Sequence, residues 1–259
     1  MTYDCITLTS DIGWEYASQM KGVIHTLAPQ MKIFDITHDI PPQNIRQGAF
    51  IIYSIIPYFP HAIHVAVIDP GVGTNRRAIL VECTKGALIG PDNGVLIPAG
   101  KRIGIKNIYN LTNDKYFIGD SSTFQGRDIF SPVAAHLSQG IHPKDIGKKI
   151  TDPVILNFEK SQKIPKGRKG KILYHDLFGN LITNITPHEF PLSFNTPVTL
   201  KTHDHTYHLH FLQSYGHGQH HELLVTLSSF GYLEISCRDG NAKDMLGIKE
   251  DDDIILTQP

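Results

Sequence analysis

The stretch of sequence that most constrains the fold runs from Val65 to Arg77. It begins as an uninterrupted apolar segment rich in β-branched residues, which is typical of a strand buried on both faces. Asp69 and a Pro-Gly-Val-Gly sequence follow, which predicts a tight turn at the carboxyl end of that strand. Ligands of open α/β sheets bind just outside such strand ends, and glycines there let a substrate approach the backbone. Asp69 is therefore predicted to line a pocket.

Two arginines follow this turn, Arg76 and Arg77. An acid beside a guanidinium group stays ionised and can orient a water molecule or a ligand hydroxyl. The competing interpretation is that Asp69 only caps the turn and that both arginines are exposed. The sequence alone leaves both interpretations open.

A second acid, Asp11, follows the strand predicted over residues 5–9. Ligands gather at the carboxyl ends of the strands of such a sheet, so Asp11 is predicted to share the pocket of Asp69. A carboxylate there suits a ribose, because it accepts hydrogen bonds from both hydroxyls of the diol. The alternative is that Asp11 is the N-cap of a helix predicted over residues 15–27.

The order of the predicted elements indicates an α/β domain with a mainly parallel central sheet. Strands over residues 5–9, 32–36 and 63–68 alternate with helices over residues 15–27 and 44–56, which places helices on both faces. Further strands are predicted over residues 78–83 and 87–89, and a helix over residues 129–137. Backbone N–H groups at the start of that last helix, after Thr123 and Phe124, can bind anions or carbonyl-type acceptors. Capping alone would also explain the residues 121–123.

The pattern changes in the last third of the chain. Residues 160–171 are polar and basic and contain Pro and Gly, which predicts an inter-domain linker. Short alternating strands then follow over residues 172–174, 181–185, 198–202, 208–212, 223–227 and 232–236, which predict a small β-barrel or sandwich. We therefore expect an N-terminal α/β catalytic domain over residues 1–159, a linker over 160–171 and a C-terminal β domain over 172–259.

Composition excludes several classes of protein. A chain of 259 residues with 41% hydrophobic residues can form a sizeable core, and a net charge of −1 gives no electrostatic reason to bind nucleic acid. Cys5, Cys83 and Cys237 are far apart, so a disulfide framework is not expected and a reduced, cytoplasmic setting is favoured. No signal peptide is expected, and the most apolar segment, residues 49–59, is too short to cross a membrane.

Histidines are frequent in the last third of the chain. His208 and His210 would share one face of a strand, a spacing compatible with metal ligation. We favour an exposed His-rich hairpin, because composition alone is weak support for a metal site. No metal or cofactor is therefore expected.

Seven motifs, in order across nearly the whole chain, resemble those of the S-adenosylmethionine hydroxide adenosyltransferases. That family comprises adenosine-forming S-adenosylmethionine hydrolases and is related to the fluorinases and chlorinases. The motifs are Leu8-Thr-Ser-Asp-Ile-Gly13, Asp35-Ile-Thr-His-Asp-Ile-Pro-Pro42, Val67-Ile-Asp-Pro-Gly-Val-Gly-Thr74, Gly90-Pro-Asp-Asn-Gly-Val-Leu96, Ser122-Thr-Phe-Gln-Gly-Arg-Asp-Ile-Phe130, Asp176-Leu-Phe-Gly-Asn180 and Ser229-Phe-Gly-Tyr-Leu-Glu234. Any one of them is weak, but all seven in family order are a specific signal.

The resemblance implies that water attacks the ribose C5′ of S-adenosylmethionine and yields adenosine and methionine. It also implies a homotrimer, with each site between the N-terminal domain of one subunit and the C-terminal domain of its neighbour. Sulfonium is a good leaving group, so the main task of such a site is to align water with the C5′–S bond.

The resemblance also assigns roles to individual residues. Asp69 and Arg76 match the first two members of the family's Asp-Arg-His catalytic triad, and Gln125 stands in the place of the histidine. The implied substrate-binding residues are Asp11 for the ribose hydroxyls, Thr123 and Phe124 beside the nucleoside, Asp176 and Asn180 facing the methionine amine, Ser229 and Glu234 near the methionine end, Tyr232, and the backbone around Cys237 at the adenine edge.

Gln125 is the one departure with a chemical consequence. Glutamine carries no titratable proton, although it can donate and accept hydrogen bonds. If the family's histidine relays a proton, activity falls by ~10²-fold or more; if it only positions water, Gln125 suffices. The alternative function is therefore a weakly active or non-catalytic binder of S-adenosylmethionine or adenosine. A halogenase is disfavoured, because the resembling halogenases carry Tyr where Asp69 stands and an anionic aspartate repels halide.

Overall fold

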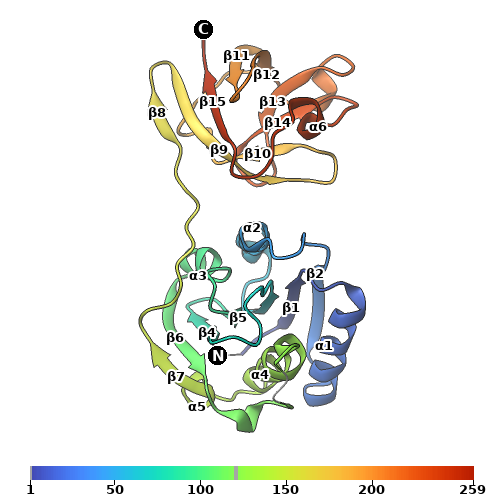
Figure 1. Cartoon of the computed structure of the whole chain (residues 1–259), viewed down its shortest axis with the longest axis vertical. Helices are drawn as coiled ribbons and strands as arrows, with labels where there is room; N and C mark the ends of the chain where they lie inside the picture. Colours follow the sequence, from blue (N-terminus) through green and yellow to red (C-terminus); the bar gives the residue numbers. More distant parts are fainter. Residues whose placement is uncertain (1, 120–121) are drawn as a thin grey trace. The chain divides into compact units, whose positions relative to one another are not determined.

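The computed structural model describes residues 2–119 and 122–259, and its contacts divide the chain into two compact units, Met1–Asn157 and Phe158–Pro259. Figure 1 shows the α/β layers of the first unit and the curved sheet of the second. Ser121, at the start of the segment predicted to precede a helix, lies outside the described residues.

The first unit is built on a sheet with the strand order β2-β1-β3-β5-β4-β6-β7. Its strands are β1 Cys5–Ser10, β2 Lys32–Thr37, β3 Ile63–Val67, β4 Ala78–Cys83, β5 Ala87–Pro91, β6 Ile105–Leu111 and β7 Gly147–Ile150. The neighbouring strands β2, β1, β3 and β5 are all parallel, whereas β4 pairs antiparallel with β5 and β6. The predicted α/β domain with a mainly parallel sheet is therefore confirmed.

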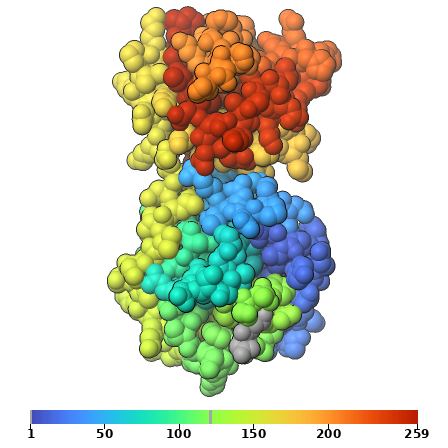
Figure 2. All heavy atoms as spheres, in the orientation of Figure 1, coloured from blue at the N-terminus to red at the C-terminus, as the bar shows by residue number. Residues whose placement is uncertain are grey.

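Helices cover both faces of this sheet, as the alternation of elements predicts. The helices are α1 Trp14–Leu27, α2 Ile45–Ile55, α3 Ile97–Ile103, α4 Ser131–Ser138 and α5 Pro143–Ile146, with a π-helical turn at Gly126–Phe130. Helices α1 and α4 pack together on one face, where their blue and green surfaces adjoin in Figure 2, and α2 packs with α3. Ala17, Met20 and Ile24 bury one side of α1, because residues three and four apart share a helix face.

The second unit is a closed β-barrel. Its strands are β8 Gln162–Ile164, β9 Gly167–His175, β10 Leu181–Thr183, β11 Thr196–Lys201, β12 Thr206–Phe211, β13 Leu223–Leu227, β14 Leu233–Cys237 and β15 Asp253–Thr257, with one short helix, α6 Ala242–Leu246. The order β10-β14-β13-β12-β11-β15-β9 closes because β9 also pairs with β10, and β8 adds to the edge of β9. The predicted β-barrel is confirmed.

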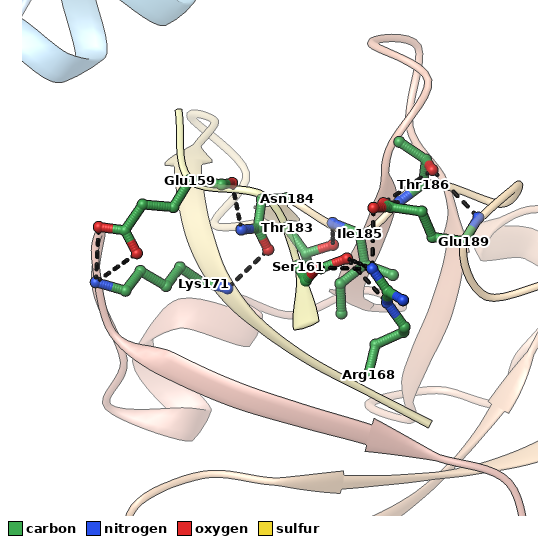
Figure 3. A network of polar contacts seen from close by, with 9 residues as sticks. All are labelled: Glu159, Ser161, Arg168, Lys171, Thr183, Asn184, Ile185, Thr186 and Glu189. Atoms are coloured by element: carbon green, nitrogen blue, oxygen red, sulfur yellow. Dashed lines mark hydrogen bonds and ion pairs between the residues drawn. The ribbon is translucent and has the colours of Figure 1, made fainter. Parts of the chain in front are cut away.

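The predicted linker over residues 160–171 is wrong in one respect, because β8 and the start of β9 form a hairpin there. The basic side chains that suggested a solvated linker have acidic partners in the folded unit: Arg168 pairs with Glu189 at 3.0 Å and Lys171 with Glu159 at 3.3 Å. Figure 3 shows these pairs beside Asn184, whose side-chain oxygen accepts from the Lys171 backbone N–H at 2.8 Å.

Strand β15 was not among the strands predicted from the sequence. Acidic residues precede this strand, and only Ile254 and Leu256 are buried along it, so the apolar signal is short. Its pairing with β9 and β11 is nevertheless necessary for the order of strands that closes the barrel.

Candidate active site

Asp11 and Asp69 follow the ends of two neighbouring parallel strands. Ser10 at the end of β1 lies opposite Val67 at the end of β3, and the Asp11 N–H donates to the Val67 carbonyl at 3.3 Å. The charge of Asp11 is one of the causes that raise the pKa of Asp69, so the two carboxylates share one electrostatic environment. The structure therefore brings together the two strand-tip acids that the sequence predicts to share a pocket.

Asp69 forms a bidentate ion pair with Arg76. The guanidinium Nε donates to Oδ1 at 3.0 Å, and Nη2 donates to Oδ2. Both side chains are almost fully buried, with 4% of Asp69 and 8% of Arg76 exposed. The interpretation of Asp69 as a mere turn cap beside an exposed Arg76 is therefore wrong, although the Asp69 carbonyl does accept from Val72 at 3.2 Å in the turn.

The turn between these two residues requires glycine. Gly73 has a φ of 77°, and a Cβ built there would lie 2.5 Å from the Ser122 carbonyl oxygen. Thr74 also holds the turn, since its hydroxyl donates to the Gly71 carbonyl at 2.7 Å. This close approach packs the turn that carries Arg76 against the segment that leads to Gln125.

Gln125 completes the contact set. Its Oε1 accepts from Arg76 Nη2 at 2.7 Å, although the two residues are 49 positions apart. Gln125 lies directly before the π-helical turn Gly126–Phe130, and the Arg76 guanidinium lies over the Phe130 ring at 5.7 Å from its centre. Arg76 therefore contacts Asp69, Gln125 and an aromatic face at once.

The electrostatics of this cluster make Asp69 a stronger base than an aspartate in water. Burial raises the pKa of Asp69, the Arg76 guanidinium and the Gly71 backbone N–H partly oppose the rise, and Asp11 adds to it. A carboxylate with a raised pKa accepts a proton more readily. Its ion pair with Arg76 fixes its orientation at the same time.

Asp11 is not the N-cap of α1, so that alternative is wrong. The N-cap residue is Gly13, and no side chain caps the helix. The Oδ2 atom of Asp11 instead accepts from the backbone N–H of Gln43 at 2.7 Å, in the loop between β2 and α2. This bond leads away from the helix and holds the carboxylate beside the strand tip.

Aromatic side chains lie next to this cluster. The Phe124 ring meets the Tyr16 ring edge-on at 5.4 Å, and the Arg127 guanidinium lies 5.2 Å from the centre of the Phe124 ring. Tyr16 is 48% exposed and Thr123 is exposed. An aromatic face of this kind can stack on a planar ring such as a nucleobase.

Asn93 and Arg77 support the site without belonging to the ion pair. The Asn93 side chain donates to the Ile68 carbonyl at 2.8 Å, which holds the backbone directly before Asp69. Arg77 donates to Asp92 at 2.8 Å and to Asp152 at 2.9 Å, so it is a structural partner of these two acids. No role for Asn93 was predicted from the sequence, although its position just after a predicted strand was an available signal.

A second polar cluster lies in the barrel. Asp176 Oδ1 accepts from the backbone N–H groups of Phe178 and Asn180, both at 2.9 Å, and Oδ2 accepts from the Asn180 side chain at 2.9 Å. Glu234 is buried and accepts from the hydroxyls of Tyr215 at 2.8 Å and Ser236 at 2.6 Å. The sequence-predicted residues Asp176, Asn180 and Glu234 therefore gather in this unit.

Burial raises the pKa of Glu234, the two hydroxyl donors oppose the rise, and the charge of Asp176 adds to it. Ser229 is exposed, and Tyr232 follows it in the turn that Ser228 closes by accepting from the Tyr232 N–H at 3.3 Å. Cys237 ends β14 with its side chain in the barrel core, three residues beyond Glu234.

Across residues 2–119 and 122–259, no group of three or more His, Cys, Asp or Glu side chains could hold a metal ion. His208 and His210 are both exposed on β12, and His210 Nδ1 lies 3.9 Å from Glu222. In the same part of the chain, every helix is too short or too polar to span a membrane.

The fold and these contacts define an α/β protein with a polar site at the tips of parallel strands, followed by a small β-barrel. Residues 6–147 match the model of the S-adenosylmethionine hydroxide adenosyltransferase N-terminal domain, and residues 170–255 match that of the C-terminal domain. The chain therefore belongs to the S-adenosylmethionine hydroxide adenosyltransferase family.

Individual relatives agree with this membership. Proteins named (R)-S-adenosyl-L-methionine hydrolase from Salinispora tropica and Methanocaldococcus jannaschii are 34% and 35% identical, and each alignment covers 97% of this chain and at least 95% of the relative. A fluorinase from Actinoplanes is 25% identical over 70% of this chain. A solved structure of an uncharacterized conserved protein from Thermotoga maritima has a TM-score of 0.93 at 32% identity, covering 98% of this chain and 100% of the other.

Proposed function

We propose that this protein is an enzyme that hydrolyses S-adenosyl-L-methionine to adenosine and L-methionine. The observation that carries the proposal is the contact set of Asp69, Arg76 and Gln125 beside Asp11, in a chain whose relatives are named for this reaction. The binder without activity is not favoured by these relatives.

In the proposed mechanism, Asp69 holds a water molecule in line with the C5′–S bond and takes one of its protons. The water oxygen forms the new bond to C5′, the C5′–S bond breaks, and its electron pair stays on sulfur as the neutral thioether of methionine. The raised pKa of Asp69 suits it to accept the proton. Arg76 fixes the orientation of the Asp69 carboxylate. Asp11 accepts hydrogen bonds from the ribose hydroxyls.

Gln125 serves in this mechanism as a positioning group for water. A guanidinium only donates hydrogen bonds, so the Gln125 atom 2.7 Å from Arg76 Nη2 is the accepting oxygen. The amide nitrogen of Gln125 is then the end that can donate to the attacking oxygen. No proton needs to pass through residue 125, because Asp69 accepts it.

The barrel is proposed to bind the two ends of the substrate. Asp176 and Asn180 would face the methionine amine, Ser229, Tyr232 and Glu234 would lie near the methionine end, and the backbone around Cys237 would contact the adenine edge. The negative charges of Asp176 and Glu234 would attract the positively charged amine of the methionine part of the substrate.

We further propose a homotrimer, with each site between the N-terminal domain of one subunit and the barrel of its neighbour. The support is exposed apolar surface beside both clusters. Trp14 is 51% exposed near Asp11, whereas Leu177 and Phe178 are 100% and 77% exposed in the loop that Asp176 holds. Apolar surface next to polar site residues is typical of an interface. A reduced, cytoplasmic setting fits the three free, buried cysteines.

The direct test is to incubate purified protein with S-adenosylmethionine and to measure adenosine and methionine by chromatography. We expect both products in equal amounts and none with Asp69→Ala. Binding of adenosine without any turnover by the natural chain would instead favour the non-catalytic alternative. Sedimentation analysis tests the trimer independently of activity.

A further inference from the structure

A hydrogen-bond network begins at Ser10, the residue that precedes Asp11. The Ser10 hydroxyl and His38 Nδ1 are 2.7 Å apart, and His38 Nε2 lies 3.0 Å from Asp35 Oδ1. Lys21 closes the chain by donating to Asp35 Oδ2 at 2.8 Å. This hydrogen-bond network joins the ends of β1 and β2 to helix α1.

The direction of these hydrogen bonds follows from the ionised state of Asp35. The bonds from His38 and Lys21 outweigh burial and hold the pKa of Asp35 below its usual value, so its carboxylate only accepts. His38 Nε2 must then be the donor to Asp35. In the neutral imidazole, Nδ1 accepts, and the Ser10 hydroxyl is the donor to it.

A Ser-His-Asp set of this kind can activate a serine nucleophile, but burial excludes that role here. Ser10 is 1% exposed and the His38 side chain is 0% exposed, so no substrate carbonyl could reach the hydroxyl. The Ser10, His38 and Asp35 side chains must therefore have a structural role within the protein.

His38 contacts the residues on both sides of Asp11, through the Ser10 side chain and the Gly13 backbone. On one side it bonds Ser10, the residue that directly precedes Asp11. On the other side the His38 carbonyl accepts from the Gly13 N–H at 3.2 Å, and the Trp14 ring meets the imidazole edge-on at 4.8 Å. The strand tip that carries Asp11 is therefore clamped between two contacts from one residue.

We infer that His38 is a positioning residue that aims the Asp11 carboxylate at the ribose hydroxyls of the substrate. The inference rests on the proposed function, because it takes a nucleoside as the ligand. It assigns a purpose to a buried polar set that the hydrolytic mechanism does not otherwise use. Its specific consequence is that loss of His38 weakens binding only through the two ribose hydroxyls.

Two ligands and two substitutions test this. Calorimetry would measure the binding of adenosine and of 2′,3′-dideoxyadenosine, which lacks both hydroxyls that Asp11 is proposed to hold. His38→Asn places a polar atom near the position of Nδ1 and keeps the Ser10 contact, whereas His38→Gln reaches only toward Asp35. We expect His38→Gln to weaken adenosine binding by about tenfold, as for a lost hydrogen bond to a charged group, and to leave dideoxyadenosine binding unchanged.

His38→Asn is expected to retain most of the adenosine affinity. In the Asp11→Asn background, adding His38→Gln should cause little further loss, because His38 acts through Asp11. Ser10→Ala, a milder change, should reproduce the selective loss if His38→Gln does not fold. The matched control is His136→Gln, a half-buried histidine on α4 that contacts Tyr116, for which no change is expected.

Equal losses for both nucleosides in His38→Gln and Ser10→Ala would overturn the inference, because a general loss of structure affects both ligands. Failure of the natural chain to bind adenosine would overturn the inference alone, because the proposed function is tested separately by turnover of S-adenosylmethionine. A natural chain that binds adenosine with the expected selectivity in the variants, but does not hydrolyse S-adenosylmethionine, would refute the proposed function and leave the role of His38 intact.

Discussion

The two units hold their acidic residues in different ways. In the α/β unit, the Asp69 carboxylate is buried against a guanidinium, which fixes its charge and its orientation. In the barrel, the hydrogen bonds to Asp176 and Glu234 come from neutral donors: backbone N–H groups, an amide and two hydroxyls. An acid with a permanent cation beside it suits chemistry at a fixed point, whereas an acid held by neutral groups can match the charge of a cationic ligand.

We therefore expect substitutions in the Asp69 contact set of the first unit to lower kcat, and substitutions of the acids in the second unit to raise KM. The largest effect is expected for Asp69→Asn, which keeps the shape of the side chain but removes the base. We expect kcat to fall by at least ~10³-fold, because both water orientation and proton acceptance are lost. Asp152→Asn is the control, since the Asp152 side chain is exposed and pairs with Arg77 rather than with Arg76. A comparable loss in this variant would contradict the role of Asp69.

Arg76→Met is expected to have the second largest effect, a loss of ~10²-fold in kcat. The Arg76 charge lowers the pKa of Asp69, so its removal raises that pKa. Because the ionised carboxylate is the active form, the acid limb of the pH–rate profile should move to higher pH. Arg76→Lys, which keeps the charge, should largely restore the position of the limb. An unshifted limb in Arg76→Met would mean that Asp69 is not the titrating base.

Residue 125 distinguishes positioning from proton transfer. Gln125→Leu removes the acceptor for Arg76 and should lower kcat by about tenfold or more. Gln125→His is expected to stay within about tenfold of the natural chain, with a new dependence on pH near the usual pKa of histidine. A much larger gain in rate with histidine would show that the natural chain lacks a proton relay, which would favour the weakly active alternative.

In the barrel, Glu234→Gln keeps the hydrogen bonds to Tyr215 and Ser236 possible while it removes the charge. We expect KM for S-adenosylmethionine to rise by about tenfold and kcat to change little, because the proposed mechanism assigns the reaction to Asp69 and not to Glu234. Steady-state kinetics separate the two parameters. A loss in kcat as large as that of Asp69→Asn would contradict the proposal that the first unit performs the chemistry and the second unit binds the substrate.

The smallest expected effect on turnover at neutral pH is at His64, which tests the stability of the first unit alone. Burial lowers the pKa of His64 from 6.5 to about 4, while the unfolded chain takes up the proton near 6.5. The unfolded state therefore binds more protons between these values, and stability falls as the pH drops from about 6.5 to 4. The full loss is about 3 kcal/mol, from 1.36 kcal/mol per pKa unit.

Urea unfolding at pH 7 and pH 4.5 would measure this loss. His64→Asn keeps an acceptor for the Thr7 hydroxyl, which lies 2.8 Å from His64 Nδ1, but carries no titratable group. The drop in stability should be smaller in this variant. His208→Asn, at an exposed site on β12, should keep the full drop. An unchanged pH dependence in His64→Asn would contradict the assignment.

Much of the fold followed from the sequence because its signals are local. The apolar run of β3 and the acid and glycines after it lie within a few residues, and the βαβαβ order implies the parallel sheet. The hairpin of β8 and β9 was not predicted, because its basic residues are paired only when Glu189 and Glu159 fold next to them. A charged segment is indistinguishable from a linker until those partners are in place.

The sequence by itself determined that acids follow the ends of β1 and β3. It also determined that a Pro-Gly-Val-Gly turn separates Arg76 from Asp69, since short-range backbone rules govern such turns. Only the tertiary structure decided that Gln125 meets Arg76, that Gln43 rather than α1 takes the Asp11 carboxylate, and that His38 bonds Ser10. These contacts join residues 28 to 49 positions apart. Closing such long loops depends on the packing of the whole sheet and its helices, which no local pattern contains.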